Sequence, residues 1–533
     1  MSKDIDKAAS ESICLEDLME ALSYYVPTGT AEGERYILQE AFVQTHEYAD
    51  IIAPPIGSPR LLIGKKGSGK SAILDFTMRF LTDAKIPGLL IKPLNLDLSS
   101  MKENGSSGEL TRVAYEQLMQ SIAVAIGQQL PMMVDESNRV LLEAAVNSGV
   151  REVDFVSKFT RALNSFSKPF TGYDFSKLLP SSMPASRLRL ERAVRRNIDA
   201  SGSAFYVLLD DTDQVANPGT KNHLNRIWAC ILAAREITQQ NNKIRFVISL
   251  RDEVWRSLEK EGTAQRDQID HFLPLVYRLN PSLDHVQRII EKRLILAAAR
   301  AGFESELPHY ELFFEGDSPR MPNSEKLSSW PDIIRSRSRE RPRDAVQFVG
   351  QMVSVALEGE AKKIDDNILS RIMPNYSRER AGLVAGEYGA ECPELLTVIR
   401  SFSKVNYAHG SFLADSETIR KHLSAIQGAL TITINGIALK SGSDDDVFKI
   451  WSLLFEAGFF YPRVSDNREK DGYRFVLPSD EPDLVCKKRW NDIQQALWEV
   501  HPVFRDFLIE DQKEHAARFG LPVKPKKPRK GFR

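Results

Sequence analysis

The sequence of 533 residues is poor in cysteine and lacks any long apolar run. Its four cysteines form neither a C-x-x-C pair nor a set with metal-ligand spacing, and a chain of this length does not need disulfide bonds to fold. No apolar stretch approaches the roughly 18 residues that a membrane-spanning helix requires. We therefore expect no membrane contact, and we expect reduced, structural thiols at Cys14, Cys230, Cys392 and Cys486.

Targeting signals and further catalytic motifs are also missing. The N-terminal stretch is polar and acidic, without a basic start followed by an apolar segment, so the expected compartment is the cytoplasm. The nine histidines include no pair with metal-ligand spacing, and the chain contains no G-x-S-x-G motif and no convincing set of nuclease carboxylates. A second catalytic centre is not predicted. If the protein takes part in a process that damages a target, the chemistry that does so would belong to a partner.

Charge is nearly balanced over the whole chain, with a formal net charge of −1, and 42% of the residues are hydrophobic. This composition is typical of a soluble globular protein, and at about 150 residues per domain the length predicts three or four units. The C-terminal stretch KPKKPRKGFR carries six positive charges and no negative one. It predicts an extended cationic arm suited to non-specific contact with DNA or RNA, with a solubilising tail or a tether to a partner as the alternative.

Apolar runs alternate with helical patterns through the first half of the chain, which predicts an α/β fold with a parallel sheet and helices on its faces. The long stretch between the second and third strands contains helical patterns. It is interpreted as a helical insertion, because a structureless loop of that length would be unusual. The expected strands cover residues 61–63, 88–97, 205–210, 244–250 and 273–279.

Residues 64–71 read GKKGSGKS and fit G-x-x-x-x-G-K-[ST] without a mismatch, between a predicted strand and a predicted helix. The glycines allow successive backbone N–H groups to point at a phosphate, and the helix adds its positive N-terminal end. Lys70 then reaches the β- and γ-oxygens, while the Ser71 hydroxyl takes one Mg²⁺ position. The predicted ATP-binding residues are Gly64, Lys65, Lys66, Gly67, Ser68, Gly69, Lys70 and Ser71.

Acidic residues follow the third predicted strand, in FYVLLDDTD. A P-loop needs a carboxylate at the end of a neighbouring strand to hold Mg²⁺ and another group to orient the attacking water. Asp210 is predicted for the Mg²⁺ shell and Asp211 for the residue that polarises water. Asp213 is a weaker candidate, because it also suits a cap of the next helix. Simple turn formation is the alternative for the pair.

Polar residues at the end of the fourth predicted strand, in FVISLRDEVW, suit contact with a γ-phosphate. Ser249 is a candidate γ-phosphate sensor, and the alternative is a core hydroxyl whose hydrogen bonds are satisfied within the protein. Arg251 is a second candidate for this contact, because it falls where the strand leaves the sheet. Arg266 is a candidate arginine finger for a neighbouring subunit, although surface arginines are common. Arg343, at a predicted helix start, is a candidate for phosphate contact from the other side, with Arg341 as the alternative.

Beyond the sheet, amphipathic helices indicate a lid, and three helices followed by a hairpin indicate a winged-helix-like domain. The predicted segments are an N-terminal helical segment (1–57), a P-loop ATPase core (58–280) with its helical insertion (105–200), a helical lid (281–390), a winged-helix-like domain (391–482), C-terminal helices (483–520) and a basic tail (521–533).

Taken in order, the P-loop, the paired aspartates, the polar fourth strand, the fifth strand and the arginine-bearing lid helix resemble the AAA+ and STAND branch of P-loop ATPases. The resemblance is strongest to bacterial groups related to origin-recognition and KAP-type ATPases, and it covers about residues 28–360 with a weaker winged-helix likeness beyond. The acid pair is Asp-Asp where typical AAA+ motors have Asp-Glu, and the insertion is long, so processive motor activity is not implied. The resemblance implies a nucleotide-controlled switch that assembles as a homo-oligomer, and several such bacterial ATPases serve antiviral defence beside a separate effector.

The third helix of the winged-helix-like domain is predicted to begin at SDDDVF. Asp444, Asp445 and Asp446 would then stand at the end that enters a DNA groove, where three carboxylates would repel phosphates. We therefore favour a packing or protein-contact role for this domain. Basic hairpin residues leave contact with a nucleic-acid backbone open, although acidic neighbours dilute them: Arg463, Arg468, Lys470 and Arg474.

Three hypotheses for the function follow from these patterns. The leading one is a Mg²⁺-dependent, ATP-hydrolysing switch whose nucleotide-dependent assembly controls a partner. The second is a DNA-loading or remodelling AAA+ ATPase, which the acidic third helix disfavours. The third is a nucleotide-binding scaffold with negligible hydrolysis, which the retained pair Asp210 and Asp211 disfavours.

Overall fold

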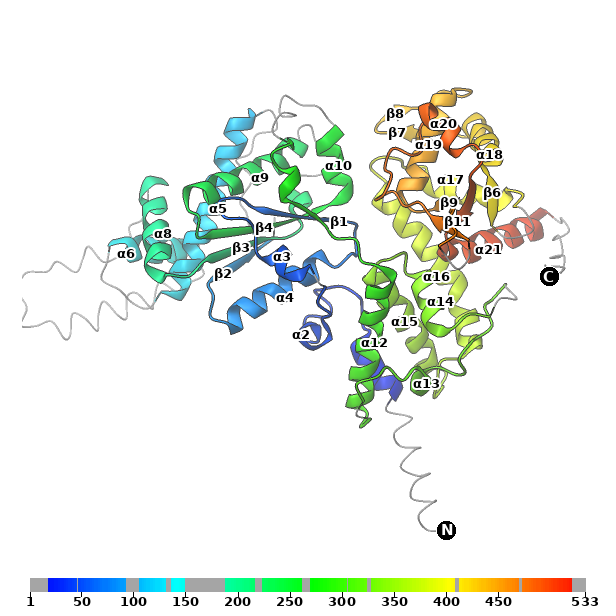
Figure 1. Cartoon of the computed structure of the whole chain (residues 1–533), viewed down its shortest axis with the longest axis horizontal. Helices are drawn as coiled ribbons and strands as arrows, with labels where there is room; N and C mark the ends of the chain where they lie inside the picture. Colours follow the sequence, from blue (N-terminus) through cyan, green and yellow to red (C-terminus); the bar gives the residue numbers. More distant parts are fainter. Residues whose placement is uncertain are drawn as a thin grey trace, which may run out of the picture. The chain divides into compact units, whose positions relative to one another are not determined.

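The chain forms two compact units in a computed structural model (Figure 1). We call Thr30–Pro281 the sheet unit, and Met1–Gly29 together with Ser282–Arg533 the helical unit. The chain therefore crosses between the units twice. The structure describes residues 18–45, 47–92, 105–130, 136–148, 187–215, 223–260, 269–303, 305–323, 327–407, 412–468 and 472–519.

A parallel five-stranded sheet in the order β2-β3-β4-β1-β5 organises the sheet unit. All five predicted strands are present, although the second ends at Ile91 and the fifth is preceded by a short 3-10 turn over Leu273–Leu275. Parallel strands need crossover connections, which here are helices. The strands are β1 (Arg60–Gly64), β2 (Gly88–Ile91), β3 (Phe205–Leu209), β4 (Ile244–Arg251) and β5 (Val276–Arg278).

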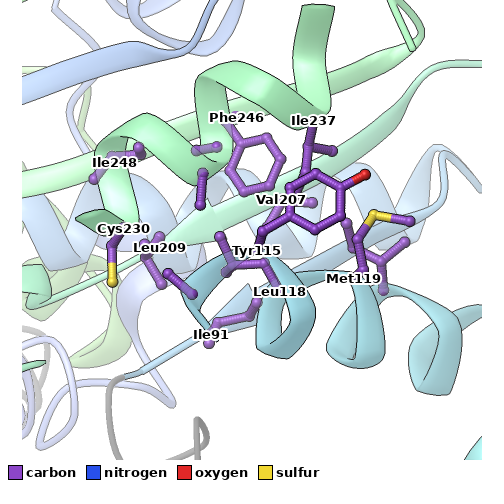
Figure 2. Packing of buried hydrophobic residues seen from close by; sticks show 14 of the residues in the cluster. Ile91, Tyr115, Leu118, Met119, Val207, Leu209, Cys230, Ile237, Phe246 and Ile248 are labelled. Carbon is purple, nitrogen blue, oxygen red and sulfur yellow. The ribbon is translucent and has the colours of Figure 1, made fainter. Parts of the chain in front are cut away.

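Alternate residues of each strand point to opposite faces of the sheet, and helices bury both faces. Leu62, Leu208 and Val247 face a cluster shared with α4 (Lys70–Asp83), and α3 (Tyr48–Ile52) lies on this side as well. Val207, Phe246 and Ile248 point to the opposite face and share one buried cluster with Tyr115 and Leu118, part of which Figure 2 shows. The short helix α2 (Leu38–Ala41) packs beside α4.

The opposite face is covered by α9 (His223–Gln240) and α5 (Ser107–Gln129), a long helix from the segment predicted as an insertion. A capping box at Ser106 and Glu109 fixes the start of α5 by satisfying otherwise unpaired backbone N–H groups. Two further helices of this segment, α6 (Glu136–Asn147) and α8 (Arg187–Ser201), pack on α5 and on each other. The helices of this segment therefore contribute directly to the core.

The crossing of α5 and α6 leaves no room for a side chain at Gly127, where an added Cβ would lie 2.0 Å from the carbonyl oxygen of Leu141. Gly127→Ala is therefore expected to lower the free energy of unfolding by about 2 kcal/mol, since the two helices must move apart. The matched control is Gly108→Ala in the same helix, where a Cβ would meet nothing within 4 Å. Urea unfolding monitored by circular dichroism measures both, and equal stability of the two variants would contradict the prediction.

A run of helices follows Ser282 in the helical unit. Trp330, Phe348 and Tyr376 lie in the core of this unit. The N-terminal residues 18–29 pack on this core, as Arg293 donates to the carbonyl of Tyr25 and Gln347 donates to that of Thr28. The helices are α12 (Leu283–Arg300), α13 (Tyr310–Phe313), α14 (Trp330–Arg337), α15 (Pro342–Glu358), α16 (Asp366–Glu387) and α17 (Leu395–Ser401).

A second sheet, in the order β10-β9-β11-β6, organises the C-terminal part of the helical unit. Helices α17, α18 (Ser416–Ala429) and α19 (Asp444–Glu456) are followed by the antiparallel pair β9 (Phe460–Ser465) and β10 (Tyr473–Phe475). Between α18 and α19 lies a small hairpin of β7 (Thr433–Ile434) and β8 (Ile437–Ala438).

The sequence patterns did not indicate strand β11 (Leu497–Val500), which lies between β9 and β6 (Leu413–Asp415) within the stretch predicted as C-terminal helices. Its residues alternate between buried Trp498 and Val500 and the more exposed residues between them, which is the period of a strand. Such a short alternation is hard to distinguish from a helix start. The stretch also holds α20 (Trp490–Ile493) and α21 (Pro502–Phe519), and α21 packs along α16.

None of the helices that the structure describes combines the length and the apolarity needed to cross a lipid bilayer.

Candidate nucleotide-binding site

The P-loop connects β1 to α4 through two glycines in the left-handed region of backbone space. Gly67 has φ +80° and Gly69 has φ +104°, and other residues adopt such angles only with strain. Helix α4 begins immediately afterwards, at Lys70. The first N–H groups of α4 have no partner within the helix, so they remain available to an anion at its N-terminus.

The side chain of Lys70 is folded back over the loop. Its Nζ donates to the carbonyl oxygens of Gly64 (2.7 Å) and Lys65 (3.2 Å). Burial lowers the pKa of this ammonium, and the charges of Glu253, Asp213 and Asp210 oppose the shift. A cation held in a desolvated pocket is suited to bind phosphate oxygens, because an anion there meets little competition from water.

The remaining loop residues form a tight cradle. The Ser68 hydroxyl is buried and has no hydrogen-bond partner among the residues that the structure describes. A Cβ added at Gly64 would lie 2.7 Å from that hydroxyl and 3.0 Å from the carbonyl of Leu279. An orphaned buried hydroxyl costs free energy, so a bound phosphate oxygen would supply the partner that is missing. Lys66 lies in the same loop and Ser71 in the first turn of α4, and both are half-buried.

On the acidic side of the site, the chain leaves β3 at Asp210, whose carboxylate is almost fully buried. The Ser249 hydroxyl on neighbouring β4 donates to Asp210 Oδ1 (2.7 Å) and accepts from the backbone N–H of Asp211 (3.0 Å). Ser249 thus fixes the two aspartates against each other. The structure places this predicted phosphate sensor as a fully buried hydroxyl whose two hydrogen bonds both serve the acid pair.

Asp211 adopts a left-handed backbone conformation with φ +48°, which is uncommon for a residue other than glycine. Burial, together with the charges of Asp210 and Asp213, raises the pKa of its carboxyl to about 6. Strained residues with a shifted pKa gather at functional sites. The raised pKa and the unusual backbone of Asp211 therefore suit the role predicted for it, which is to polarise the attacking water.

Asp213 contributes more to this site than the sequence patterns suggested. It lies in a short 3-10 turn (Thr212–Val215), and its Oδ2 pairs with Nε of Arg251 at 2.9 Å. Its Oδ1 is buried without a hydrogen-bond partner among the described residues, and burial raises its pKa. Arg251 therefore lies at the end of β4 with its guanidinium engaged by this carboxylate.

The candidate lid arginines lie in the helical unit. Arg341 is buried and donates twice from Nη1 to Glu387, at 2.8 and 2.9 Å. Arg343 is half-buried, with Nη2 3.8 Å from Glu387, and its Nε and Nη2 make no hydrogen bond to a described residue. Arg343 thus has N–H donors that no described residue engages, whereas Nη1 of Arg341 is engaged by Glu387. The predicted finger Arg266 and the basic tail lie outside the described residues.

Two carboxylates that the sequence analysis did not select lie close to the site. Glu253 belongs to the first turn of α10 (Asp252–Lys260), directly after β4. Asp75 is buried in α4, one turn beyond Ser71, and burial raises its pKa. Their positions in the sequence indicated the site only weakly. Asp75 is four residues beyond Ser71 and so shares its face of α4, and Glu253 follows β4 and so belongs to the same sheet edge.

The site as a whole suits a nucleoside triphosphate with Mg²⁺. Ser71 and Asp210 come from the two places where a P-loop protein holds the ion, and oxygen ligands of this kind are those that Mg²⁺ prefers. The register aligns Gly64 of β1 with Arg251 of β4, so the loop and the β4 end share one edge of the sheet. Ligands of open α/β sheets bind at this edge.

Comparisons with known proteins are distant. No family model matches the chain. Over 250 residues it is 24% identical to the putative transposon gamma-delta 80.3 kDa protein of Escherichia coli strain K12, a match that covers 44% of this chain and 34% of that protein. The chain thus spans about a third of the length of this curated relative.

Among solved structures, the chain is similar to the Aeropyrum pernix ORC2 protein in its ADPNP and ADP complexes, with a TM-score of 0.39, 11% identity and coverage of 87% of this chain and 89% of the other. It is also similar to the Aeropyrum pernix ORC1 protein in complex with DNA, with a TM-score of 0.32, 15% identity and coverage of 91% and 98%. The fold assignment rests on the chain's own strand order and loop geometry, which make the sheet unit an α/β P-loop NTPase core.

Proposed function

We propose that the protein is a Mg²⁺-dependent ATPase that acts as a nucleotide-controlled switch, and we place it with the AAA+ and STAND branch of P-loop ATPases. One observation carries the proposal. Lys70, buried over the P-loop, lies at the same sheet edge as Asp210, Asp211 and Asp213, so a cationic phosphate cradle meets a cluster of carboxylates.

The chemistry assigned to each residue follows from its position. When bound, Mg²⁺ would supply positive charge that offsets the negative charge of the phosphates. Ser71 and Asp210 would hold the ion, and Lys70 would leave the loop carbonyls for the phosphate oxygens. Asp211 would accept a proton from the attacking water, for which a pKa of about 6 is well matched to neutral pH.

A switch needs two conformations that bind the nucleotide with different affinity. A nucleotide that binds one conformation of the protein better than another would shift the population toward that conformation. The proposed partners are further copies of this chain and a separate effector, in a setting such as antiviral defence.

A DNA-remodelling ATPase is the second candidate, and one observation favours it more than the sequence did. Asp444 is paired with Arg420 at 2.9 Å, and Asp445 is paired with Lys487 at 3.0 Å. The Asp446 carboxylate accepts from the backbone N–H of Lys440 and pairs with Lys449. The carboxylates at the start of α19 are therefore largely neutralised within the unit, which weakens the predicted repulsion of phosphate.

One experiment tests the proposal and separates it from the second candidate. We expect the full chain to hydrolyse ATP only with Mg²⁺, and its molar mass by light scattering to increase with ATP relative to ADP. Duplex DNA should change the rate less than twofold. Stimulation by DNA of tenfold or more would favour remodelling, and Mg²⁺-dependent binding without hydrolysis would favour the scaffold.

A further inference from the structure

Alternation along β4 decides which face of the sheet its last residues point to. Phe246, Ile248 and Leu250 belong to the cluster on the face covered by α5 and α9. The residues between them point the other way, and Ser249 and Arg251 are the last two of these. The side chain of Arg251 therefore starts on the same face as α4, the helix that follows the P-loop.

The pairing of β4 with β1 sets the position of Arg251 along the sheet edge. Its backbone is opposite Gly64, the first residue of the P-loop, in the parallel register. Leu62, two residues before Gly64, belongs to the cluster on the α4 face, so this position of β1 has the same orientation. Arg251 thus ends its strand level with the start of the P-loop and on the P-loop's side of the sheet.

One carboxylate holds the Arg251 side chain by one edge of its guanidinium. Asp213 Oδ2 lies 2.9 Å from Nε, and the Asp213 side chain is 5% exposed, against 28% for that of Arg251. The terminal Nη1 and Nη2 of Arg251 make no hydrogen bond to a residue within the described ranges. Because a guanidinium presents its N–H donors as a rigid fork, an arginine held at Nε can still bind a phosphate through both terminal groups.

The holding carboxylate is itself fixed before any ligand binds. Asp213 belongs to the 3-10 turn that follows β3, and it is buried there. Its Oδ1 has no hydrogen-bond partner among the described residues, an arrangement that costs stability and is typical of a residue with a functional contact. An arginine side chain loses much rotamer freedom when it binds a ligand, and the contact with Asp213 restricts that freedom in advance.

We propose that Asp213 is a positioning residue that preorganises Arg251 to bind the terminal phosphate, so that the pair makes the site prefer a nucleoside triphosphate to a diphosphate. This inference rests on the proposed nucleotide binding and adds what distinguishes the two ligands. Asp213 holds Nε, and the terminal groups of Arg251 bind the phosphate that a diphosphate lacks. The P-loop, with Lys70, binds the phosphates that both ligands share.

The preference is measured as the ratio of the dissociation constants of ADP and of a non-hydrolysable ATP analogue, by isothermal titration of the full chain with Mg²⁺. We expect Arg251→Ala to reduce this ratio about tenfold or more and Asp213→Asn about fivefold, because charge-assisted bonds to phosphate are strong and depend on geometry. Both changes should come from weaker binding of the ATP analogue, while the affinity for ADP changes less than about twofold. Retained ADP binding also shows that each variant is folded.

A double-mutant cycle separates positioning from a merely structural role. In the Arg251→Ala background, Asp213→Asn should not change the ratio further, because Asp213 acts only through this arginine. Asp213→Glu keeps the charge and should restore part of the preference.

Arg278→Ala is the matched control. Arg278 ends β5 and pairs with Asp252 at 2.8 Å, but its neighbours Val276 and Tyr277 pack on the α5 and α4 faces respectively, so alternation places Arg278 on the face away from α4. This variant should leave the ratio within about twofold of the wild type.

An unchanged ratio in Arg251→Ala or in Asp213→Asn would overturn the inference while leaving the proposed function in place. Additive effects in the double variant, or equal affinity of the wild type for the two ligands, would overturn it as well. If the wild type binds neither ligand, or binds both independently of Lys70, the proposed function fails together with this inference.

Discussion

Lys70→Ala is expected to weaken binding of Mg²⁺ and ATP at least a hundredfold and to abolish hydrolysis. The ammonium is the cation that the loop carries inward over its own carbonyls, and Arg251 at the end of β4 is already paired with Asp213. A charge-assisted interaction in a desolvated site contributes several kcal/mol, and each 1.4 kcal/mol is a factor of ten.

Two measurements test this expectation, namely isothermal titration with a non-hydrolysable ATP analogue and phosphate release under saturating ATP. The fold should survive the substitution, because burial already disfavours the Lys70 charge and its removal relieves that cost. Lys421→Ala is the control for loss of a lysine, since that side chain is 76% exposed on α18. Wild-type hydrolysis by a well-folded Lys70→Ala variant would show that the P-loop is not where ATP is hydrolysed.

Asp211→Asn is expected to reduce hydrolysis by a factor of about 10² to 10⁴ while ATP binding is retained. The amide keeps the shape of the side chain and the hydrogen bond from the Asp211 N–H to Ser249, but it cannot accept a proton from water. Single-turnover hydrolysis and ATP binding, measured on the same preparation, separate the two effects. If hydrolysis persists, Asp213 becomes the carboxylate to substitute, because its Oδ1 is buried and has no hydrogen-bond partner among the described residues.

The same substitution should stabilise the fold. The pKa of Asp211 rises from 3.8 to about 6 on folding, because burial and neighbouring carboxylates disfavour its charge. A raised folded pKa means that the folded chain binds this proton more tightly than the unfolded chain, so the contribution of Asp211 to stability falls as pH rises from about 4 to 6 and stays low above. At pH 7.5 we therefore expect Asp211→Asn to gain about 1 to 2 kcal/mol, after allowance for solvent screening of this partly exposed group.

Urea unfolding at pH 7.5 and at pH 4 measures this gain and its pH dependence. The gain should be present at pH 7.5 and largely absent at pH 4, where the folded and unfolded chains both hold much of the proton. Asp199→Asn, at an exposed position on α8, is the control and should change the free energy of unfolding by less than 0.5 kcal/mol. A loss of stability in Asp211→Asn would contradict the cause assigned to the pKa shift.

The P-loop was recognisable because its chemistry is local. Eight consecutive residues supply the turn, the cation and the hydroxyl, and the flanking strand and helix are encoded in the adjoining periodicity. The five strands of the parallel sheet were predictable for the same reason, since strands buried on both faces read as continuous apolar runs. Strand β11 was not, because four alternating residues carry too little periodic signal.

The contacts among the site residues depend on the strand order of the sheet. Ser249 was a candidate phosphate sensor, with a satisfied core hydroxyl as the alternative. Because β4 lies next to β3, its hydroxyl reaches Asp210 and the N–H of Asp211. The same order places Arg251 against Asp213 and opposite Gly64. None of these pairs could be read from spacing, because the partners come from different strands and only the hydrogen-bond register brings them to one edge.

The sequence by itself determined that a phosphate cradle stands between a strand and a helix, and that carboxylates follow a later strand of the same sheet. Those features depend on backbone angles and helix ends, which neighbouring residues set. Only the tertiary structure decided which hydrogen bonds Lys70 makes and which cations pair with Asp213 and Asp444. Electrostatic effects depend on distance and burial, and both arise only when segments far apart in the sequence pack together.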